Sequence, residues 1–352
     1  MVKSGPLAVN LFCMALQRSP RHLLTLQDLT NQELEELIEL SIQVKGAGAQ
    51  PILTGRTAGL LFFRGSLRTR ASFEVAVHQL GGHSINLNAS SDFWELEARA
   101  GSIMDGRAPE HIKDAATILS RYVDALAIRP KPEGQSWAVD RRDESIRAWA
   151  QTAEVPVINM ESALHHPLQA LADMMTMRET LGSLRGKRLA VVWTHSPVPS
   201  STAVVHSLLM AAARLGMEIS ISHPPGFHLD GEVVGRAQAV SEEQGTELRC
   251  VDAPDEAAEG AHIIYARSWR SLEYYGNATL EASHRARTTD RIVDAKLLAR
   301  GADARFMHAM PVRRNTEVTD EVLDGECSLA YEQGANRLHS LKALLIKLLG
   351  NS

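Results

Sequence analysis

The sequence is poor in cysteine and contains no long run of apolar residues. Its 352 residues include only Cys13, Cys250 and Cys327, and none of them belongs to a Cys-x-x-Cys pair. The sequence therefore indicates neither a disulfide framework nor a zinc site, and it fits a reducing, cytoplasmic compartment. No segment approaches the roughly 20 apolar residues that a membrane span needs. The first 20 residues are too weakly apolar to indicate a signal peptide.

The sequence also lacks an excess of positive charge. Lysine and arginine number 37 against 42 aspartates and glutamates, which gives a formal net charge of −5. This balance argues against a general nucleic-acid-binding protein, which normally carries a basic excess. With 44% hydrophobic and 22% charged residues, the composition is that of a globular protein with sizeable cores. The length suggests two domains.

Short apolar segments with the character of β-strands alternate with amphipathic helices. Residues 30–46 begin with a capping threonine and carry Leu34, Leu37, Ile38 and Leu40 at helical spacing. The predicted strands are 57–63, 83–88, 123–129, 155–159, 188–194, 217–222, 246–252, 261–267 and 304–310. Such alternation predicts an α/β protein with two domains, each containing a parallel sheet flanked by helices.

The two series of strands and helices join near residues 160–185. The pattern of residues 161–187 predicts one helix that ends before the next strand. We therefore expect a first domain over residues 1–165 and a second over residues 166–334. Ligands of open α/β sheets bind beyond the carboxyl ends of the strands. The motifs of interest fall at those ends, which makes them candidates for one shared site.

Positive charge is concentrated at one strand-to-helix turn, residues 64–74, with the sequence RGSLRTRASFE. Ser66 is placed to cap a helix over about 67–79, and a helix N-terminus offers free N–H groups to an anion. The segment Arg68-Thr69-Arg70 adds charge-assisted donors, and the glycine before Ser66 allows close backbone approach. The turn predicts a site for a small, phosphate-sized anion. An ordinary helix cap with solvated arginines is the alternative.

Three further segments follow later strands, in the order IRPKP, HHPLQALAD and MHAMPVRRN. Together with SLRTR, this set resembles the aspartate/ornithine carbamoyltransferase family from about residue 25 to the C-terminus. The resemblance implies that the arginine turn binds the phosphate of carbamoyl phosphate. Arg129 and His166 would donate hydrogen bonds to the carbamoyl carbonyl, with Thr69 as a third candidate donor. Gln169 would form a hydrogen bond with the carbamoyl NH₂.

The resemblance thereby implies a complete set of carbamoyl phosphate ligands. The binding residues are Ser66, Leu67, Arg68, Thr69, Arg70, Arg129, His166, Gln169, Ala309, Met310 and Arg337. The catalytic residues are Arg129, His166, Gln169 and His308. No metal or organic cofactor is implied, because the leaving phosphate is already activated. Two positions depart from the family pattern: Arg64-Gly65 replaces Asn-Pro or Asn-Ser, and Ala309-Met310 replaces Cys-Leu.

The second substrate is an amine, and two segments bear on its identity. Residues 265–277 lack the Asp-x-x-x-Ser-Met-Gly motif with which ornithine carbamoyltransferases recognise a free α-amino acid. Residues 91–112 combine a tryptophan loop with Met-Asp-Gly and Glu-His, a mark of the N-acetylornithine and N-succinylornithine enzymes. Pro109 stands where the acetyl-specific relatives carry glutamate and the succinyl-specific ones carry proline. A glutamate there would repel the second carboxylate of a succinyl group.

We therefore expect transfer to the δ-amine of N-succinyl-L-ornithine, in arginine biosynthesis. N-acetylornithine, ornithine or a specialised amine are alternatives, and a non-enzymatic anion-binding relative is the other class. The expected substrate-binding residues are Trp94, Pro109, Glu161, Arg178, Arg267 and Arg270. Arg267 is the first choice for the succinyl carboxylate, although each of the three arginines is also a candidate surface residue. A purely structural role for Glu161 is equally open.

The resemblance also implies an assembly and a route for the reaction. The Trp94 loop would reach a neighbouring subunit, giving a homotrimer with shared active sites and no nucleic-acid or membrane partner. The C-terminal helix, residues 335–352, has Leu338, Leu341, Leu344 and Leu348 on one face and would pack back on the first domain. The neutral amine would attack directly, through a tetrahedral intermediate, and the phosphate could take the proton. Glu317 receives no role.

Overall fold

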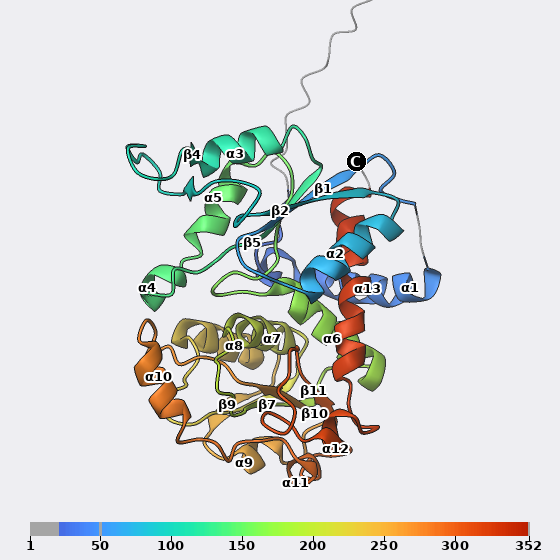
Figure 1. Ribbon diagram of the computed structural model, residues 1–352. Coiled ribbons are helices and arrows are strands. Elements are labelled where there is room, and N and C mark those ends of the chain that lie inside the picture. Colours follow the sequence, from blue (N-terminus) through green and yellow to red (C-terminus); the bar gives the residue numbers. More distant parts are fainter. Residues whose placement is uncertain (1–20, 49–50, 351–352) are drawn as a thin grey trace, which may run out of the picture.

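All nine strands predicted from the sequence are present in the computed structural model, which describes residues 21–48 and 51–350. They form two parallel sheets in two separate layers (Figure 1). The first sheet has the order β2-β1-β5-β6, with β1 (Thr57–Phe62), β2 (His83–Asn88), β5 (Ala125–Arg129) and β6 (Val157–Asn159). The second has the order β11-β10-β7-β8-β9, with β7 (Arg188–Trp193), β8 (Glu218–Ser222), β9 (Leu248–Val251), β10 (Ile263–Arg267) and β11 (Arg305–Met307). The predicted fold class is confirmed.

The helices lie on the faces of the two sheets, as crossover connections between parallel strands require. Those of the first half are η1 (Leu26–Asp28), α1 (Asn31–Ala47), α2 (Arg68–Gln79), α3 (Ile112–Leu119), α4 (Trp137–Asp140), α5 (Glu144–Thr152) and α6 (Pro167–Leu181). Those of the second are α7 (Ala203–Arg214), α8 (Gly231–Glu243), α9 (Pro254–Ala258), α10 (Ala278–Arg285), α11 (Ala295–Leu298), α12 (Asp320–Leu323) and α13 (Ala330–Leu349). Within the described ranges, no helix is both long and apolar enough to cross a bilayer.

The first predicted helix begins where the sequence indicated. Thr30 caps α1 and forms a capping box with Glu33, because each side chain bonds the other's backbone N–H. Sequence reasoning missed the pair β3 (Leu96–Glu97) and β4 (Glu110–His111), which join in parallel inside the loop after β2. Strands of two residues carry no periodicity that a sequence pattern could reveal.

The helix predicted over residues 161–187 is shorter than expected. It begins only at Pro167, which occupies the first helical turn, and it ends before Gly182 at φ 69°. Glu161 has φ 140°, outside the helical region. Residues 161–166 therefore form an irregular segment at the carboxyl end of β6. This leaves their side chains free to face the space between the domains.

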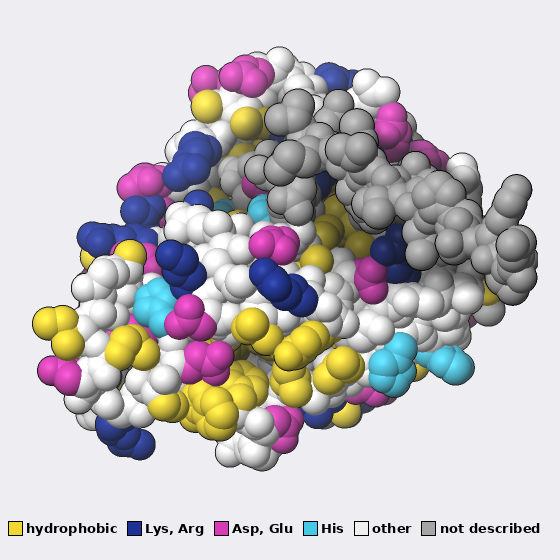
Figure 2. All heavy atoms as spheres, turned by 90° about the horizontal axis from the view of Figure 1, so that it is seen from above, with side chains coloured by type: hydrophobic (Ala, Val, Ile, Leu, Met, Phe, Trp, Pro, Cys, Tyr) yellow, Lys and Arg dark blue, Asp and Glu magenta, His cyan; other side chains and the backbone are white. Residues whose placement is uncertain are grey.

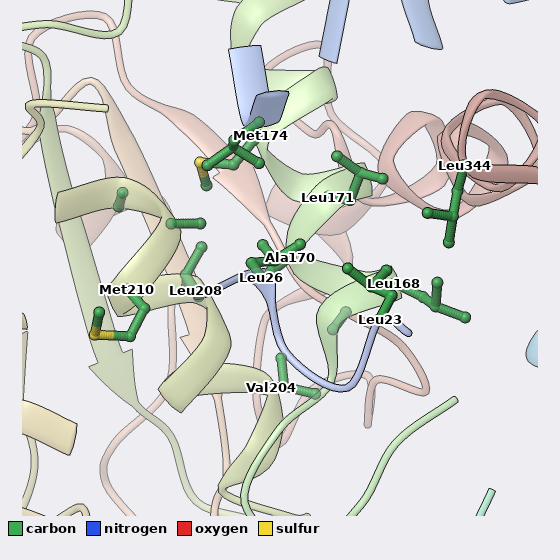
Figure 3. Close-up of a cluster of buried hydrophobic side chains, with 14 of the residues drawn as sticks. Leu23, Leu26, Leu168, Ala170, Leu171, Met174, Val204, Leu208, Met210 and Leu344 are labelled. Carbon is green, nitrogen blue, oxygen red and sulfur yellow. The ribbon is translucent and has the colours of Figure 1, made fainter. Parts of the chain in front are cut away.

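One continuous core crosses both domains. It contains Leu60 and Phe62 of β1 together with Val191 and Trp193 of β7. Figure 3 shows how α6 connects them: its apolar side chains lie between those of α7, α13 and the segment that contains Leu23. Helix α13, red in Figure 1, packs against α1, α2 and α6. The packing of α6 and α13 thus joins the cores of the two domains.

The chain order of the strands reverses once in each sheet. In the first sheet the reversal lies between β1 and β5, and in the second between β7 and β10. Loops that leave such neighbouring strands in opposite directions open a crevice at the carboxyl edge of a sheet. The arginine turn follows β1, Arg129 ends β5 and Arg267 ends β10. Both crevices therefore carry residues singled out from the sequence.

Candidate active site

A cavity of about 250 Å³ lies between the two domains, and most of the predicted carbamoyl phosphate residues line it. The first domain contributes Arg64, Ser66, Arg68, Thr69, Arg129 and Glu161; α6 and α13 contribute His166, Gln169 and Arg337; the second domain contributes Pro199, Ser200, Ser201, Val204, Arg267, Ala309, Met310 and Pro311. Among these described lining residues, five are arginines and Glu161 is the sole acid. The cavity therefore favours an anion carrying more than one negative charge.

The arginine turn has the geometry of a helix start. Helix α2 begins at Arg68, and the Ser66 hydroxyl accepts the Thr69 N–H at 3.3 Å. Burial, together with Arg267, lowers the pKa of Arg68. Its Nε atom is buried and has no hydrogen-bond partner within the described part of the chain. A buried donor without a partner is costly unless a ligand satisfies it.

Three side chains from distant parts of the sequence meet at the Thr69 hydroxyl. Arg337 of α13 donates to Thr69 Oγ1 at 2.6 Å, and Arg129 donates to the same oxygen at 3.4 Å. Arg337 also donates to Gln169 Oε1 at 3.0 Å. Burial, with the nearby charge of Arg129, lowers the pKa of Arg337 to about 10. It still carries its charge at pH 7, so the cavity keeps all five cations.

A buried network of hydrogen bonds fixes the position of the Gln169 side chain. Its amide nitrogen donates to Asp173 Oδ1 at 2.8 Å, and Gln333 donates to the same oxygen at 2.6 Å. The hydroxyl of Tyr265 donates to Asp173 Oδ2 at 3.1 Å. Burial raises the pKa of Asp173 to about 6, although these donors oppose the shift. The network fixes which end of the Gln169 amide faces the cavity.

Glu161 is the acid that faces the cavity arginines. It is ion-paired with Arg129, and its Oε2 lies 3.4 Å from Arg64 Nη2 and 3.9 Å from His166 Nε2. Burial alone would raise the pKa of Glu161, but the charges of Arg64 and Arg129 lower it to about 2. The carboxylate is therefore ionised at any physiological pH, and it balances part of the positive charge of the cavity.

His166 presents a neutral imidazole to the cavity. It precedes α6, and its backbone N–H is held by the Ser207 hydroxyl at 2.8 Å. Burial lowers the pKa of His166 well below its ordinary value, and Arg337 and Arg129 act in the same direction. Its Nδ1 atom has no partner among residues 21–48 and 51–350. A neutral ring can donate one hydrogen bond to a carbonyl oxygen without adding a formal charge.

The second domain closes the cavity with Arg267 and the loop after β11. Arg267 is 6% exposed, and its Nε and Nη1 atoms have no hydrogen-bond partner in the described structure. Ala309 and Met310 line the cavity, whereas His308 lies one layer behind them. His308 Nδ1 accepts the Met310 N–H at 3.0 Å, and its Nε2 lies 2.7 Å from Glu317 Oε2. Glu317, to which the sequence gave no role, thus contacts the histidine that supports this loop.

Several predicted residues lie elsewhere. Arg178 sits on α6 but forms ion pairs with Glu35 and Glu39 of α1, at 2.5 and 2.7 Å, and it does not line the cavity. It lies nine positions after Gln169, which places it on the opposite face of the helix and about 14 Å along its axis.

Two members of the predicted phosphate set also point away from the cavity. The Arg70 guanidinium lies over the Phe62 ring, 4.6 Å from its centre, rather than in the cavity. Residues two apart on a helix face different directions, so Arg68 and Arg70 cannot both point inward. The Leu67 side chain is 79% exposed. Only its backbone N–H at the helix start remains available for an anion.

Trp94 and Pro109 are exposed in the loop after β2, outside their own chain's cavity. Trp94 is 60% exposed, and its indole N–H donates to Glu110 at 2.8 Å. Arg270 lines a second cavity that adjoins the first. These three residues are therefore not brought together with Arg129 and His166 within one chain.

Sequence reasoning missed Arg64 and the loop after β7. Arg64 was noted only as a departure from a pattern, yet it donates to the backbone oxygens of Pro130 at 3.1 Å and Glu161 at 2.9 Å. Pro199, Ser200 and Ser201 line the cavity from the second domain. Their position directly after a predicted strand was the available signal, because loops at carboxyl ends form the site.

The arrangement suits transfer of an acyl-type group from phosphate. Buried arginines can bind a dianionic phosphate and stabilise it as it leaves. Arg129 and neutral His166 can donate to a carbonyl oxygen that gains negative charge. Gln169 offers its amide oxygen beside them.

Comparison with known proteins gives the same family for both halves of the chain. Residues 21–179 match the carbamoyl phosphate-binding domain of aspartate/ornithine carbamoyltransferases, and residues 186–348 match their aspartate/ornithine-binding domain. The N-acetylornithine carbamoyltransferase of Xanthomonas campestris pv. campestris is 37% identical over 337 residues, covering 95% of this chain and 99% of its own length. The ornithine carbamoyltransferase of Halalkalibacterium halodurans is 38% identical over 335 residues, covering 94% and 95%.

Solved structures agree with these sequence matches. A crystal structure of acetylornithine transcarbamylase complexed with acetylcitrulline has a TM-score of 0.90 and 37% identity, covering 93% of this chain and 98% of that one. A glutamate-to-proline variant of N-acetyl-L-ornithine transcarbamylase, complexed with carbamyl phosphate and N-succinyl-L-norvaline, has the same score and covers 99% of its own chain. The present chain belongs to the aspartate/ornithine carbamoyltransferase family, in its N-acylornithine branch, and is a carbamoyltransferase.

Proposed function

We propose that this chain transfers the carbamoyl group of carbamoyl phosphate to the δ-amine of N-succinyl-L-ornithine, giving N-succinylcitrulline and phosphate in the cytoplasm. The observation that carries the proposal is the cavity in which five arginines and neutral His166 surround a space for a dianion with an attached carbonyl. Ser66, Arg68, Thr69 and the N-terminus of α2 would hold the phosphate.

In the proposed reaction a bond forms between the amine nitrogen and the carbamoyl carbon. The bond from that carbon to the phosphate oxygen then breaks, and phosphate leaves with the electron pair. Arg129 and His166 donate to the carbonyl oxygen in the tetrahedral intermediate. The buried Nε of Arg129, which lacks a partner within the described residues, is one available donor. The departing phosphate takes the amine proton, so no side chain has to act as a base.

The choice of a succinyl group rests on Pro109 and on the charge of the second domain. Pro109 carries no carboxylate, and variants of N-acetyl-L-ornithine transcarbamylase in which a glutamate is replaced by alanine, proline, serine or valine hold N-succinyl-L-norvaline. A negative group at Pro109 would disfavour a second carboxylate on the substrate. Arg267, buried and with two atoms lacking partners in the described structure, is a candidate to bind a substrate carboxylate.

N-acetyl-L-ornithine is the second candidate, favoured by the names of the relatives that match across nearly the whole chain. Free ornithine is the third, since ornithine carbamoyltransferases match with similar identity. The absence of Asp-x-x-x-Ser-Met-Gly from residues 265–277 argues against it.

We also propose a homotrimer in which each cavity is completed by a neighbour's Trp94 loop. Trp94 is exposed and lies outside the cavity of its own chain. Looking down on the first domain, Figure 2 shows hydrophobic side chains gathered on one part of that face. The exposed large apolar residues of this domain include Ile85, Ile103, Met104, Ile118 and Tyr122. Exposed apolar side chains gathered on one part of a surface are typical of a protein–protein interface.

The deciding experiment measures phosphate release from carbamoyl phosphate with N-succinylornithine, N-acetylornithine and ornithine side by side. We expect the highest kcat/KM for the succinyl compound. Pro109→Glu should reverse the preference by about 10- to 100-fold, a like-charge cost of about 1.4–2.8 kcal/mol. Pro109→Ala, which adds no charge, is the matched control. If the unmodified enzyme prefers the acetyl compound, the amine substrate is N-acetylornithine rather than N-succinylornithine. The proposed carbamoyl transfer reaction would be unaffected.

A further inference from the structure

A second cavity, of about 280 Å³, adjoins the first and shares Arg64, Pro199 and Ser201 with it. It lies between the loop after β5, which contributes Pro132, Gly134 and Trp137, and the second domain, which contributes Thr202 and Arg270. A molecule reacting in the first cavity can therefore extend past Arg64 into the second.

This second cavity has an unbalanced positive charge. Arg64 and Arg270 both line it, and none of its described lining residues is acidic. The bonds of Arg64 to Pro130 and Glu161 use Nε and Nη2, which leaves Nη1 for a ligand. Arg270 lies over the Tyr275 ring, 5.0 Å from its centre. Stacking on a flat wall holds a guanidinium in place while its edge donates.

The carboxylate of Asp140 lies near this cavity and already accepts hydrogen bonds from other groups of the protein. Asp140 accepts the Tyr275 hydroxyl at 2.6 Å and the backbone N–H groups of Glu133 and Gly134 at 2.8 and 2.7 Å. These donors therefore stabilise the negative charge of Asp140.

Thr202 supplies an independent sign of a ligand. It lines the same cavity and is 1% exposed, yet its Oγ1 atom has no hydrogen-bond partner in the described structure. Buried hydroxyls in proteins are nearly always paired. A ligand oxygen in this cavity would satisfy it.

We propose that Arg64, Arg270 and Thr202 form a carboxylate-binding subsite for the amine substrate. The inference rests on the proposed function, because the amine must extend from the reacting carbon in the first cavity. Arg64 acts here as a specificity-determining residue that reaches both cavities. The Trp137 and Tyr275 rings give flat apolar walls for the carbon chain that leads to the carboxylate.

The test uses N-succinyl-L-norvaline, which lacks the δ-amine and so binds without reacting, in the presence of carbamoyl phosphate. We expect Arg270→Gln and Arg64→Asn each to weaken its binding by about 10- to 100-fold in calorimetry, as loss of a charged hydrogen bond predicts. Thr202→Val should weaken it by about 3- to 10-fold. Arg287→Gln, which removes an exposed arginine near Tyr274, is the control and should bind as the unmodified enzyme does.

N-acetyl-L-norvaline separates the two carboxylates that the subsite could take. A loss confined to the succinyl probe assigns the acyl carboxylate, and an equal loss with both probes assigns the α-carboxylate. Unchanged binding of both probes in Arg270→Gln and Arg64→Asn overturns the subsite. Arg270→Lys keeps the charge and should retain part of the affinity, which separates a binding defect from misfolding.

Phosphate release distinguishes this inference from the proposed function. Turnover of N-succinylornithine that is equal in Arg270→Gln and the unmodified enzyme would leave the function standing and remove the subsite. No turnover by the unmodified enzyme, with probe binding still lost in Arg270→Gln, would support the subsite and remove the proposed amine.

Discussion

Glu161 and Asp173 are two buried carboxylates in one part of the chain, and their pKa values are shifted in opposite directions. Glu161 faces Arg64 and Arg129, and its pKa is lowered to about 2. Asp173 faces neutral donors, Gln169, Gln333 and Tyr265, and burial raises its pKa to about 6. Hydrogen bonds from neutral groups offset less of the desolvation penalty than nearby cations do. Position relative to the arginines, not burial, decides which carboxylate is firmly charged.

The difference also separates two tasks. Glu161 balances cations that a phosphate could balance instead, so its environment changes when a ligand binds. Asp173 accepts a hydrogen bond from the Gln169 amide and so holds this cavity side chain in place. A carboxylate paired with cations thus lies where a ligand could exchange with it, and a carboxylate held by neutral donors lies where the side chains are fixed.

The largest expected effect is that of Glu161→Gln. The substitution keeps the shape but removes the carboxylate facing the cavity arginines, so the phosphate-free protein should lose about 3 kcal/mol of stability, as when a buried ion pair loses one partner. Phosphate should restore most of this loss, because it supplies the missing negative charge and binds only the folded state. Thermal unfolding with and without phosphate measures both effects.

Asp173→Asn is the matched control for that experiment, since it alters a buried carboxylate that faces no ligand. Phosphate should stabilise it no more than it stabilises the unmodified protein. Equal stabilisation of Glu161→Gln and the unmodified protein by phosphate would show that Glu161 does not occupy the anion's place.

A smaller effect is expected in the pH dependence of Asp173→Asn. The folded-state pKa of about 6 lies above the ordinary value of 3.8, so the folded protein binds the proton more tightly. Asp173 therefore adds stability as the pH falls from about 6 to 4, and this contribution, about 2–3 kcal/mol, is lost as the pH rises through 6. The variant should lack that gain.

The measurement is the difference between the two stability curves over pH 4–7. Asp143, whose pKa burial also raises to about 6, contributes equally to both curves and cancels. Parallel curves for variant and unmodified protein would mean that Asp173 is already ionised without cost, as Glu161 is.

The smallest effect is that of Tyr265→Phe, which removes one donor to Asp173. We expect a loss of about 1 kcal/mol when Asp173 is neutral and about 2 kcal/mol when it is charged, because bonds to ionised acceptors are stronger. Urea unfolding at pH 5 and pH 8 tests this. An identical loss at both pH values would place the Tyr265 hydroxyl outside the titrating network.

The sequence predicted the nine main strands because buried parallel strands are continuous apolar runs bounded by turns. It predicted Ser66, Arg68 and Thr69 as a group because a strand–turn–helix unit fixes its own donors locally. It did not predict that Arg70 lies over Phe62 or that Arg178 pairs with Glu35, since the direction of a side chain on a helix depends on which face packs against the rest of the protein. The role of Arg64 could not be read from its position alone.

By itself, then, the sequence determined the α/β architecture, the family and the local geometry of the arginine turn. Local hydrogen bonding and apolar periodicity decide these features, and both are written in neighbouring residues. Only the tertiary structure decided that Arg337 of α13 meets Thr69 of α2, that Glu161 pairs with Arg129, and that Arg64 and Arg270 line one cavity. These contacts join residues far apart in the chain, and the packing of α6 and α13 between two sheets sets their distances.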